Sequence, residues 1–183
     1  MMPGKILAAA AAVLLSSCLA ARADGPTGQF NATAEVETSM GTQSIGMSIV
    51  VTSPMTRADA KVYKKILKDR GQRGLAAAIR GGNQGSFRFG ALEYPVDMVI
   101  AEPVQDGYRF IVITTRPLQY EEVRQGKASL NNPFTVAVFT VPDFGWGDGQ
   151  LYTKAKLTID SDGRVQAATY KNRTGSLKDV TRQ

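Results

Sequence analysis

Residues 108–115, Tyr-Arg-Phe-Ile-Val-Ile-Thr-Thr, constrain the fold more than any other part of the chain. They follow an Asp-Gly turn at 106–107 and consist mainly of the β-branched and aromatic residues that favour strands. In a strand, Phe110 and Val112 point to one face, whereas Ile111 and Ile113 point to the other. A strand that is apolar on both faces is covered on both faces, so we expect it in the middle of a sheet.

Most of the remaining segments also predict strands. Residues 134–141 are apolar on both faces, and residues 151–159 alternate, with Leu151, Ala155 and Leu157 on the inward side. Shorter strands are predicted at 29–36, 44–52, 85–89, 96–101, 165–170 and 177–180. Because nearly every connection has hairpin length, we expect a mainly β (α+β) fold with an antiparallel sheet, as a sandwich or a partly open barrel.

The first 23 residues have the pattern of a secretory signal peptide. An apolar stretch at 6–15 follows a short basic start, and Ala21-Arg22-Ala23 offers a small-x-small cleavage pattern. Leu15-Ser16-Ser17-Cys18 also resembles the lipobox of bacterial lipoproteins, in which the cysteine becomes the lipidated first residue. Cleavage after Ala23 and lipidation at Cys18 are both open. Either route predicts a periplasmic or extracellular protein, and the second adds a lipid anchor to the outer membrane.

The composition of residues 24–183 excludes several classes of site. This stretch, which we expect to form a single domain, has no cysteine and no histidine. Disulfide frameworks, thiolate or histidine metal sites and Ser-His-Asp triads are therefore excluded. We expect neither a metal nor a cofactor.

A basic helical hairpin is predicted as an insert at about residues 56–81. Thr56 is the expected N-cap, with Asp59 three residues later, and Gly71 is expected to end a first helix before a second short helix at 75–80. A helical wheel divides the first helix into two faces. The apolar face contains Ala58, Val62, Tyr63, Ile66 and Leu67, and the basic face contains Arg57, Lys61, Lys64, Lys65 and Lys68.

The positive charge of the protein is concentrated in this insert. The chain holds 22 basic and 16 acidic residues, and two of the basic ones, Lys5 and Arg22, precede residue 24. Residues 57–80 hold eight basic and two acidic residues, a net charge of +6, so the rest of the domain carries −2. Contact with an anionic membrane surface or envelope polymer would use Lys61, Lys64, Lys65 and Lys68. The alternative is the solvated back of an amphipathic helix, and nucleic acid is not expected as a partner of an exported protein.

Residues 142–150, Pro-Asp-Phe-Gly-Trp-Gly-Asp-Gly-Gln, form the most unusual predicted loop. Trp146 is the only tryptophan and lies between Asp143 and Asp148. An aromatic side chain between carboxylates is suited to ligand contact, which makes these three residues candidates for a binding site. Alternatively, the tryptophan folds back over the edge of the sheet.

Carboxylates are the main catalytic groups that remain for an enzyme. A pair could come from Glu93, Asp97, Glu102, Glu121 or Glu122, although their spacing on separate strands does not fix their separation in space. We therefore expect a non-catalytic binding or envelope-associated protein. The alternative is a carboxylate-based hydrolase acting on envelope glycans.

Three segments resemble parts of an uncharacterised family of exported bacterial proteins. They are Leu67-Lys68-Asp69-Arg70-Gly71-Gln72, residues 109–117 and residues 129–142. The resemblance extends over most of the chain after residue 23. It implies export and a single domain, and it implies no activity and no catalytic residues.

Overall fold

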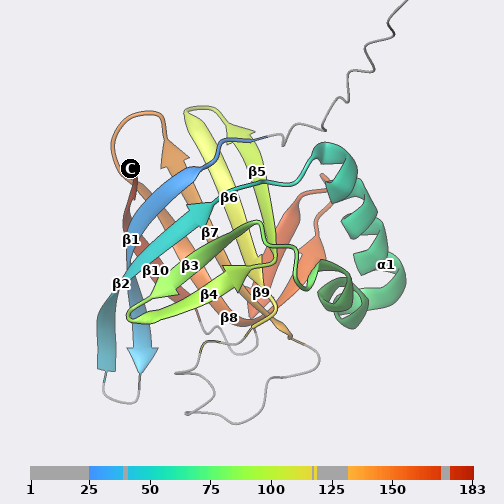
Figure 1. Ribbon diagram of the computed structural model, residues 1–183, viewed down its shortest axis with the longest axis horizontal. Coiled ribbons are helices and arrows are strands. Elements are labelled where there is room, and N and C mark those ends of the chain that lie inside the picture. The colour runs from blue at the N-terminus through green and yellow to red at the C-terminus, as the bar shows by residue number, and fades with distance from the viewer. Residues whose placement is uncertain (1–24, 39–40, 117, 119–131, 170–173) are drawn as a thin grey trace, which may run out of the picture.

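The described part of the chain folds into a curled antiparallel sheet with one helix outside it (Figure 1). The computed structural model describes residues 25–38, 41–116, 118, 132–169 and 174–183. The elements are β1 (Gly28–Thr38), β2 (Gly41–Val51), α1 (Arg57–Ile79), β3 (Gly85–Phe89), β4 (Leu92–Val96), β5 (Met98–Val104), β6 (Gly107–Thr114), β7 (Phe134–Pro142), β8 (Gly147–Ile159), β9 (Val165–Thr169) and β10 (Thr174–Arg182).

The sheet curls into a half-barrel. Its strand order runs β4-β3-β2-β1-β10-β8-β7-β6-β5, with β9 paired to β8, and all pairs are antiparallel. The two end strands of this order, β4 and β5, are consecutive in the chain and flank Asp97. The curl therefore brings the two edges of the sheet together at Asp97. The expectation of a mainly β fold with a partly open barrel is confirmed.

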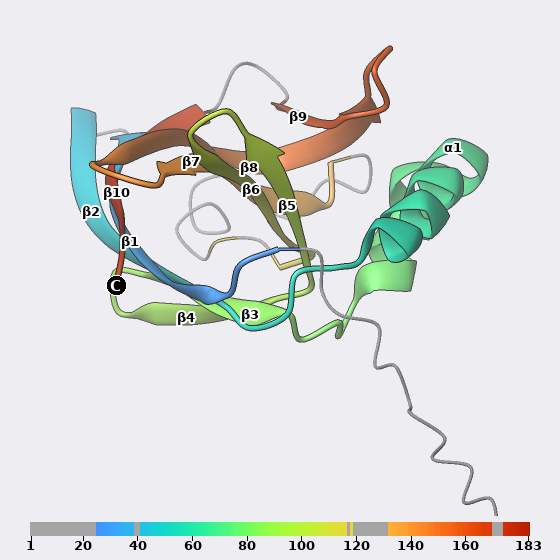
Figure 2. The same cartoon turned by 90° about the horizontal axis from the view of Figure 1, so that it is seen from above.

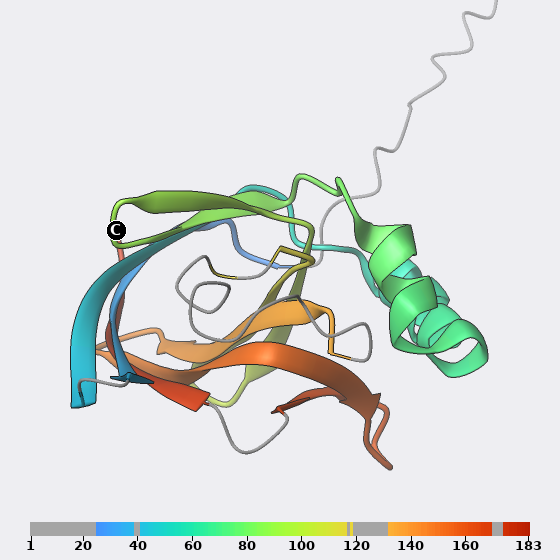
Figure 3. The same cartoon turned by 90° about the horizontal axis from the view of Figure 1, so that it is seen from below.

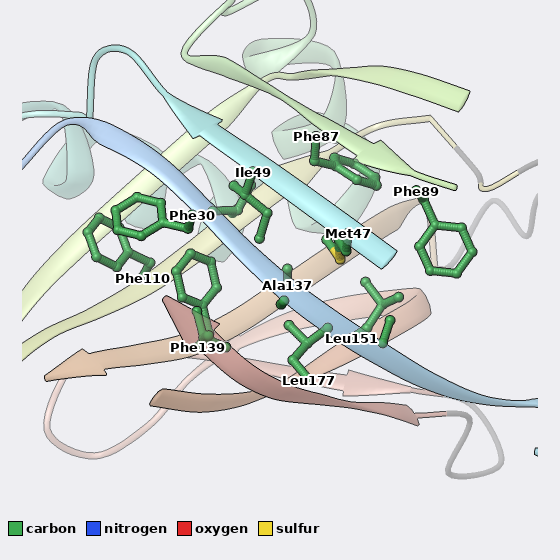
Figure 4. Close-up of a cluster of buried hydrophobic side chains, with 14 of the residues drawn as sticks. Phe30, Met47, Ile49, Phe87, Phe89, Phe110, Ala137, Phe139, Leu151 and Leu177 are labelled. Carbon is green, nitrogen blue, oxygen red and sulfur yellow. The ribbon is translucent and has the colours of Figure 1, made fainter. Parts of the chain in front are cut away.

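Aromatic side chains fill the concave side of the sheet (Figure 4). The rings of Phe30, Phe110 and Phe139 lie against one another, with centroids 4.8–5.5 Å apart. These separations fall in the range favoured by aromatic pairs, and all three side chains are almost completely buried. The side chains of Val112, Ala137, Leu151 and Leu177, among others, complete this inner core.

A second core lies between the convex side of the sheet and α1. Figures 2 and 3 show α1 outside the curled sheet, and Ile111 and Ile113 of β6 face this side. The helix contributes Leu75, Ala76 and Ile79 as buried residues. The expectation that residues 108–115 are covered on both faces is thus confirmed. As expected, β6 is an interior strand, paired with β5 and β7, although it lies only one strand from the edge of the sheet. The helix supplies its outer cover.

A bulge in β8 overturns the expected single inward face of residues 151–159. Lys154 has φ 49°, and the pairing of β8 with β7 shifts register across this region. Leu151 therefore belongs to the inner core, whereas Ala155 and Leu157 belong to the outer core. An extra residue reverses the side on which every later side chain of a strand lies.

The helical insert has the expected break at Gly71, whose φ of 63° and ψ of −164° interrupt α1. Its packing differs from the expected apolar face, because Ala58 and Val62 are exposed and the helix buries mainly residues after the break. Gln72 fixes α1 to β8: its side-chain amide donates to the carbonyl of Leu157 and accepts from the Leu157 N–H. Within the described part of the chain, no helix is long and apolar enough to cross a membrane.

Candidate functional site

The connection between β7 and β8 exposes two large aromatic side chains. Phe144 is 94% exposed and Trp146 is 75% exposed. We call residues 143–146 the aromatic tip. Gly145 lies between the two aromatic residues with φ 94°, a conformation that favours glycine. The expectation that Trp146 could fold back over the sheet edge is wrong, because the side chain is mostly in solvent.

Two paired strands, β7 and β8, hold the aromatic tip at its ends. The strand β8 begins at Gly147, so the expected loop over residues 142–150 is shorter than predicted and Asp148 lies on a strand. A Cβ atom at Gly147 would lie 1.8 Å from the Thr140 carbonyl oxygen, so β7 and β8 approach too closely here for a side chain. The Asp143 N–H donates to the Asp106 carbonyl at 2.9 Å, which joins the tip to the β5–β6 turn.

A small pocket lies beside the aromatic tip, at the end of the inner core. It has a volume of about 110 Å³, with the aromatic side chains of Phe30, Tyr108 and Phe110 in its wall. Asp143 and Arg182 supply its charged groups. Arg182 also donates to the Thr27 carbonyl at 2.8 Å. Apolar walls with a few polar groups are typical of ligand pockets, although this one is small for an organic ligand.

The two predicted carboxylates flank the aromatic pair in the chain. Asp143 and Asp148 are both exposed, as is Asp106 on the neighbouring turn. The structure thus brings Trp146, Asp143 and Asp148 to one end of the barrel, and it adds Phe144, which the sequence reasoning missed. The close spacing of Phe144 and Trp146 across a glycine was the available signal for it.

The predicted basic face of α1 is less uniform than a helical wheel suggests. Lys65 pairs with Asp69 at 2.8 Å, and the ammonium group holds the pKa of that carboxyl below its usual value. Lys64 is half-buried, and its Nζ donates to the carbonyl of Gly163. Lys61 and Lys68 are exposed. One of the four predicted lysines is therefore neutralised within the helix, since Asp69 lies one turn beyond Lys65.

The candidate catalytic carboxylates that the structure describes are engaged by different partners. Glu102 pairs with Arg109 at 2.8 Å, and the exposed Glu93 lies 3.5 Å from Arg88. Asp97 is buried and accepts three hydrogen bonds. Glu121 and Glu122 lie outside the described residues.

Among the described residues that line the two polar pockets, neither pocket has the carboxylate pair that glycoside hydrolysis requires. The pocket beside the aromatic tip has Asp143 as its one carboxylate among the described lining residues. The pocket beside Asp97 has Asp97 alone among the residues that the structure describes there.

No group of three or more potential ligand side chains that could hold a metal ion occurs within the described residues. Cys18 and the signal-peptide pattern fall outside these residues.

Comparison of the chain with protein-family models, with characterised proteins and with solved structures gave no match. The geometry of the aromatic tip is therefore the main guide to function.

Proposed function

We propose that this is an exported, non-catalytic binding protein that recognises a glycan-containing polymer of the cell envelope through its aromatic tip. The observation that carries the proposal is the exposure of Phe144 and Trp146 on one short connection. Large apolar side chains gathered on a surface mark interaction sites more often than isolated ones do. Tryptophan is also among the residues that contribute most to binding energy at interfaces.

The chemistry around the two rings favours a glycan. A sugar ring has a flat C–H face that can lie on an aromatic ring, and its hydroxyl groups donate hydrogen bonds. Asp143 and Asp148 are exposed carboxylates on either side of Trp146, and ionised carboxylates only accept hydrogen bonds. The tip thus combines apolar surface with acceptors for hydroxyl and amide donors.

The basic face of α1 supports association with the envelope at a second place. Figure 1 shows α1 on the opposite side of the barrel from the C-terminus, beside which the β7–β8 connection lies. Lys61 and Lys68 remain exposed for an anionic membrane surface or polymer, while Lys64 and Lys65 have partners within the molecule. Such a contact would leave the aromatic tip free.

The test compares binding of purified peptidoglycan and of a soluble N-acetylglucosamine oligosaccharide by wild type and by Phe144→Ala/Trp146→Ala. We expect affinity to fall about tenfold or more, as for hot-spot aromatics. The control is Leu92→Ala/Ile159→Ala, which removes two other exposed apolar side chains and should bind like wild type. Equal binding by both double variants would contradict the proposal, and so would a wild type that binds neither glycan.

A further inference from the structure

A second pocket lies where the two edges of the sheet meet, away from the aromatic tip. Its volume is about 390 Å³, within the range of small-molecule sites. The described residues in its wall are Arg80, Gly81, Asn83, Pro95, Asp97, Thr115 and Arg116. They come from the end of α1, from the β4–β5 junction and from the end of β6.

Asp97 holds the two sides of this pocket together. One carboxylate oxygen accepts from the N–H of Gly81 at 2.8 Å. The other accepts from the N–H of Thr115 at 2.7 Å and from its hydroxyl at 2.8 Å. Gly81 follows Arg80 in the chain, and Thr115 precedes Arg116. The buried carboxylate therefore fixes the backbone beside each arginine.

The backbone of Arg116 is fixed further by two hydroxyl groups. Its N–H donates to Thr114 Oγ1 at 3.2 Å, and its carbonyl accepts from Thr135 Oγ1 at 3.2 Å. Both threonine side chains belong to buried residues. The backbone of Arg116, just after β6, is therefore held on both sides. A fixed backbone of this kind is what a preorganised binding site requires.

The charges in the pocket favour an anion. Arg80 and Arg116 are exposed, and neither has a carboxylate within salt-bridge distance among the described residues. The charge of Asp97 is already engaged by three donors. Two guanidinium groups against one engaged carboxylate leave the pocket with net positive charge.

We propose that this pocket binds a small molecule through a phosphate monoester group held between Arg80 and Arg116. Guanidinium groups bind phosphate through paired hydrogen bonds. The two arginines come from different elements, and a tetrahedral phosphate offers oxygens in more than one plane, whereas a carboxylate offers two oxygens in one plane. The volume exceeds that of a phosphate ion and leaves room for the organic group that carries it.

Calorimetric titration of the purified protein with glycerol phosphate, inorganic phosphate and succinate tests this proposal. We expect glycerol phosphate to bind more tightly than succinate, and Arg80→Gln or Arg116→Gln to weaken its binding about tenfold or more. Arg73→Gln is the matched control, because it removes an exposed arginine from the same helical segment outside the pocket. All three variants should keep the wild-type melting temperature, since these side chains are exposed.

A parallel titration with phosphatidic acid vesicles distinguishes a lipid headgroup from a soluble phosphate ester. Binding to vesicles alone, lost in both pocket variants, would assign the phosphate to a lipid. Three results would overturn the proposal: no binding of any phosphate probe, equal weakening by Arg73→Gln, or succinate binding as tightly as glycerol phosphate. None of them bears on the aromatic tip.

Discussion

Phe139 and Phe144 lie five positions apart in the chain and have opposite environments. Phe139 of β7 is 1% exposed and lies against Phe30 and Phe110, whereas Phe144 on the aromatic tip is 94% exposed. The first ring is removed from water by folding and stabilises the barrel. The second ring remains in water, so it contributes almost nothing to the free energy of folding. An apolar side chain that the fold does not use is available for a partner, and Trp146 beside it is similarly exposed.

The largest expected effect is a difference in stability between the alanine variants of these two phenylalanines. Phe139→Ala should lower the free energy of unfolding by about 3–5 kcal/mol, the usual range for deleting a core aromatic residue. Phe144→Ala should change it by about 0.5 kcal/mol or less, as for a surface substitution. Chemical denaturation of both variants measures the difference. Similar losses in the two variants would mean that the aromatic tip packs on the protein in solution.

A smaller effect concerns the basic face of α1, where the structure divides the lysines into two groups. Lys61→Gln/Lys68→Gln should weaken binding to anionic vesicles at low salt, and wild-type binding should fade as salt is added. Lys65→Gln should weaken it less, because Lys65 is already paired with Asp69. The melting temperature should stay nearly constant, since these residues are exposed. If wild type does not bind the vesicles at low salt, the lysines form a solvated face only.

Local sequence patterns predicted much of the fold. The two-sided apolar pattern of residues 108–115 correctly indicated cover on both faces, and Gly71 correctly indicated the break in α1. The bulge at Lys154 had no such signal, because lysine rarely adopts a positive φ. Gly147 was assigned to a loop, although it allows the close approach of β8 to the Thr140 carbonyl. Glycine occurs both in loops and where two strands approach closely, and sequence alone does not distinguish these two cases.

The two candidate sites differ in how far the sequence could predict them. The aromatic tip is local in the chain, so Trp146, Asp143 and Asp148 could be proposed together. The exposure of Trp146 depends on what surface lies nearby, which the sequence does not give. The pocket at Asp97 unites Arg80 and Arg116 from distant segments, and only the closing of the sheet brings them together.

The fluorescence of Trp146 tests the central claim most directly, because the chain has no other tryptophan. In the free protein, we expect the emission of a solvent-exposed indole that acrylamide quenches readily, since the side chain is 75% exposed. Adding the N-acetylglucosamine oligosaccharide should shift the emission to shorter wavelength and protect the indole from acrylamide, and Phe144→Ala should reduce both changes. Unchanged emission and quenching at concentrations where calorimetry detects binding would contradict the claim that the aromatic tip is the binding site.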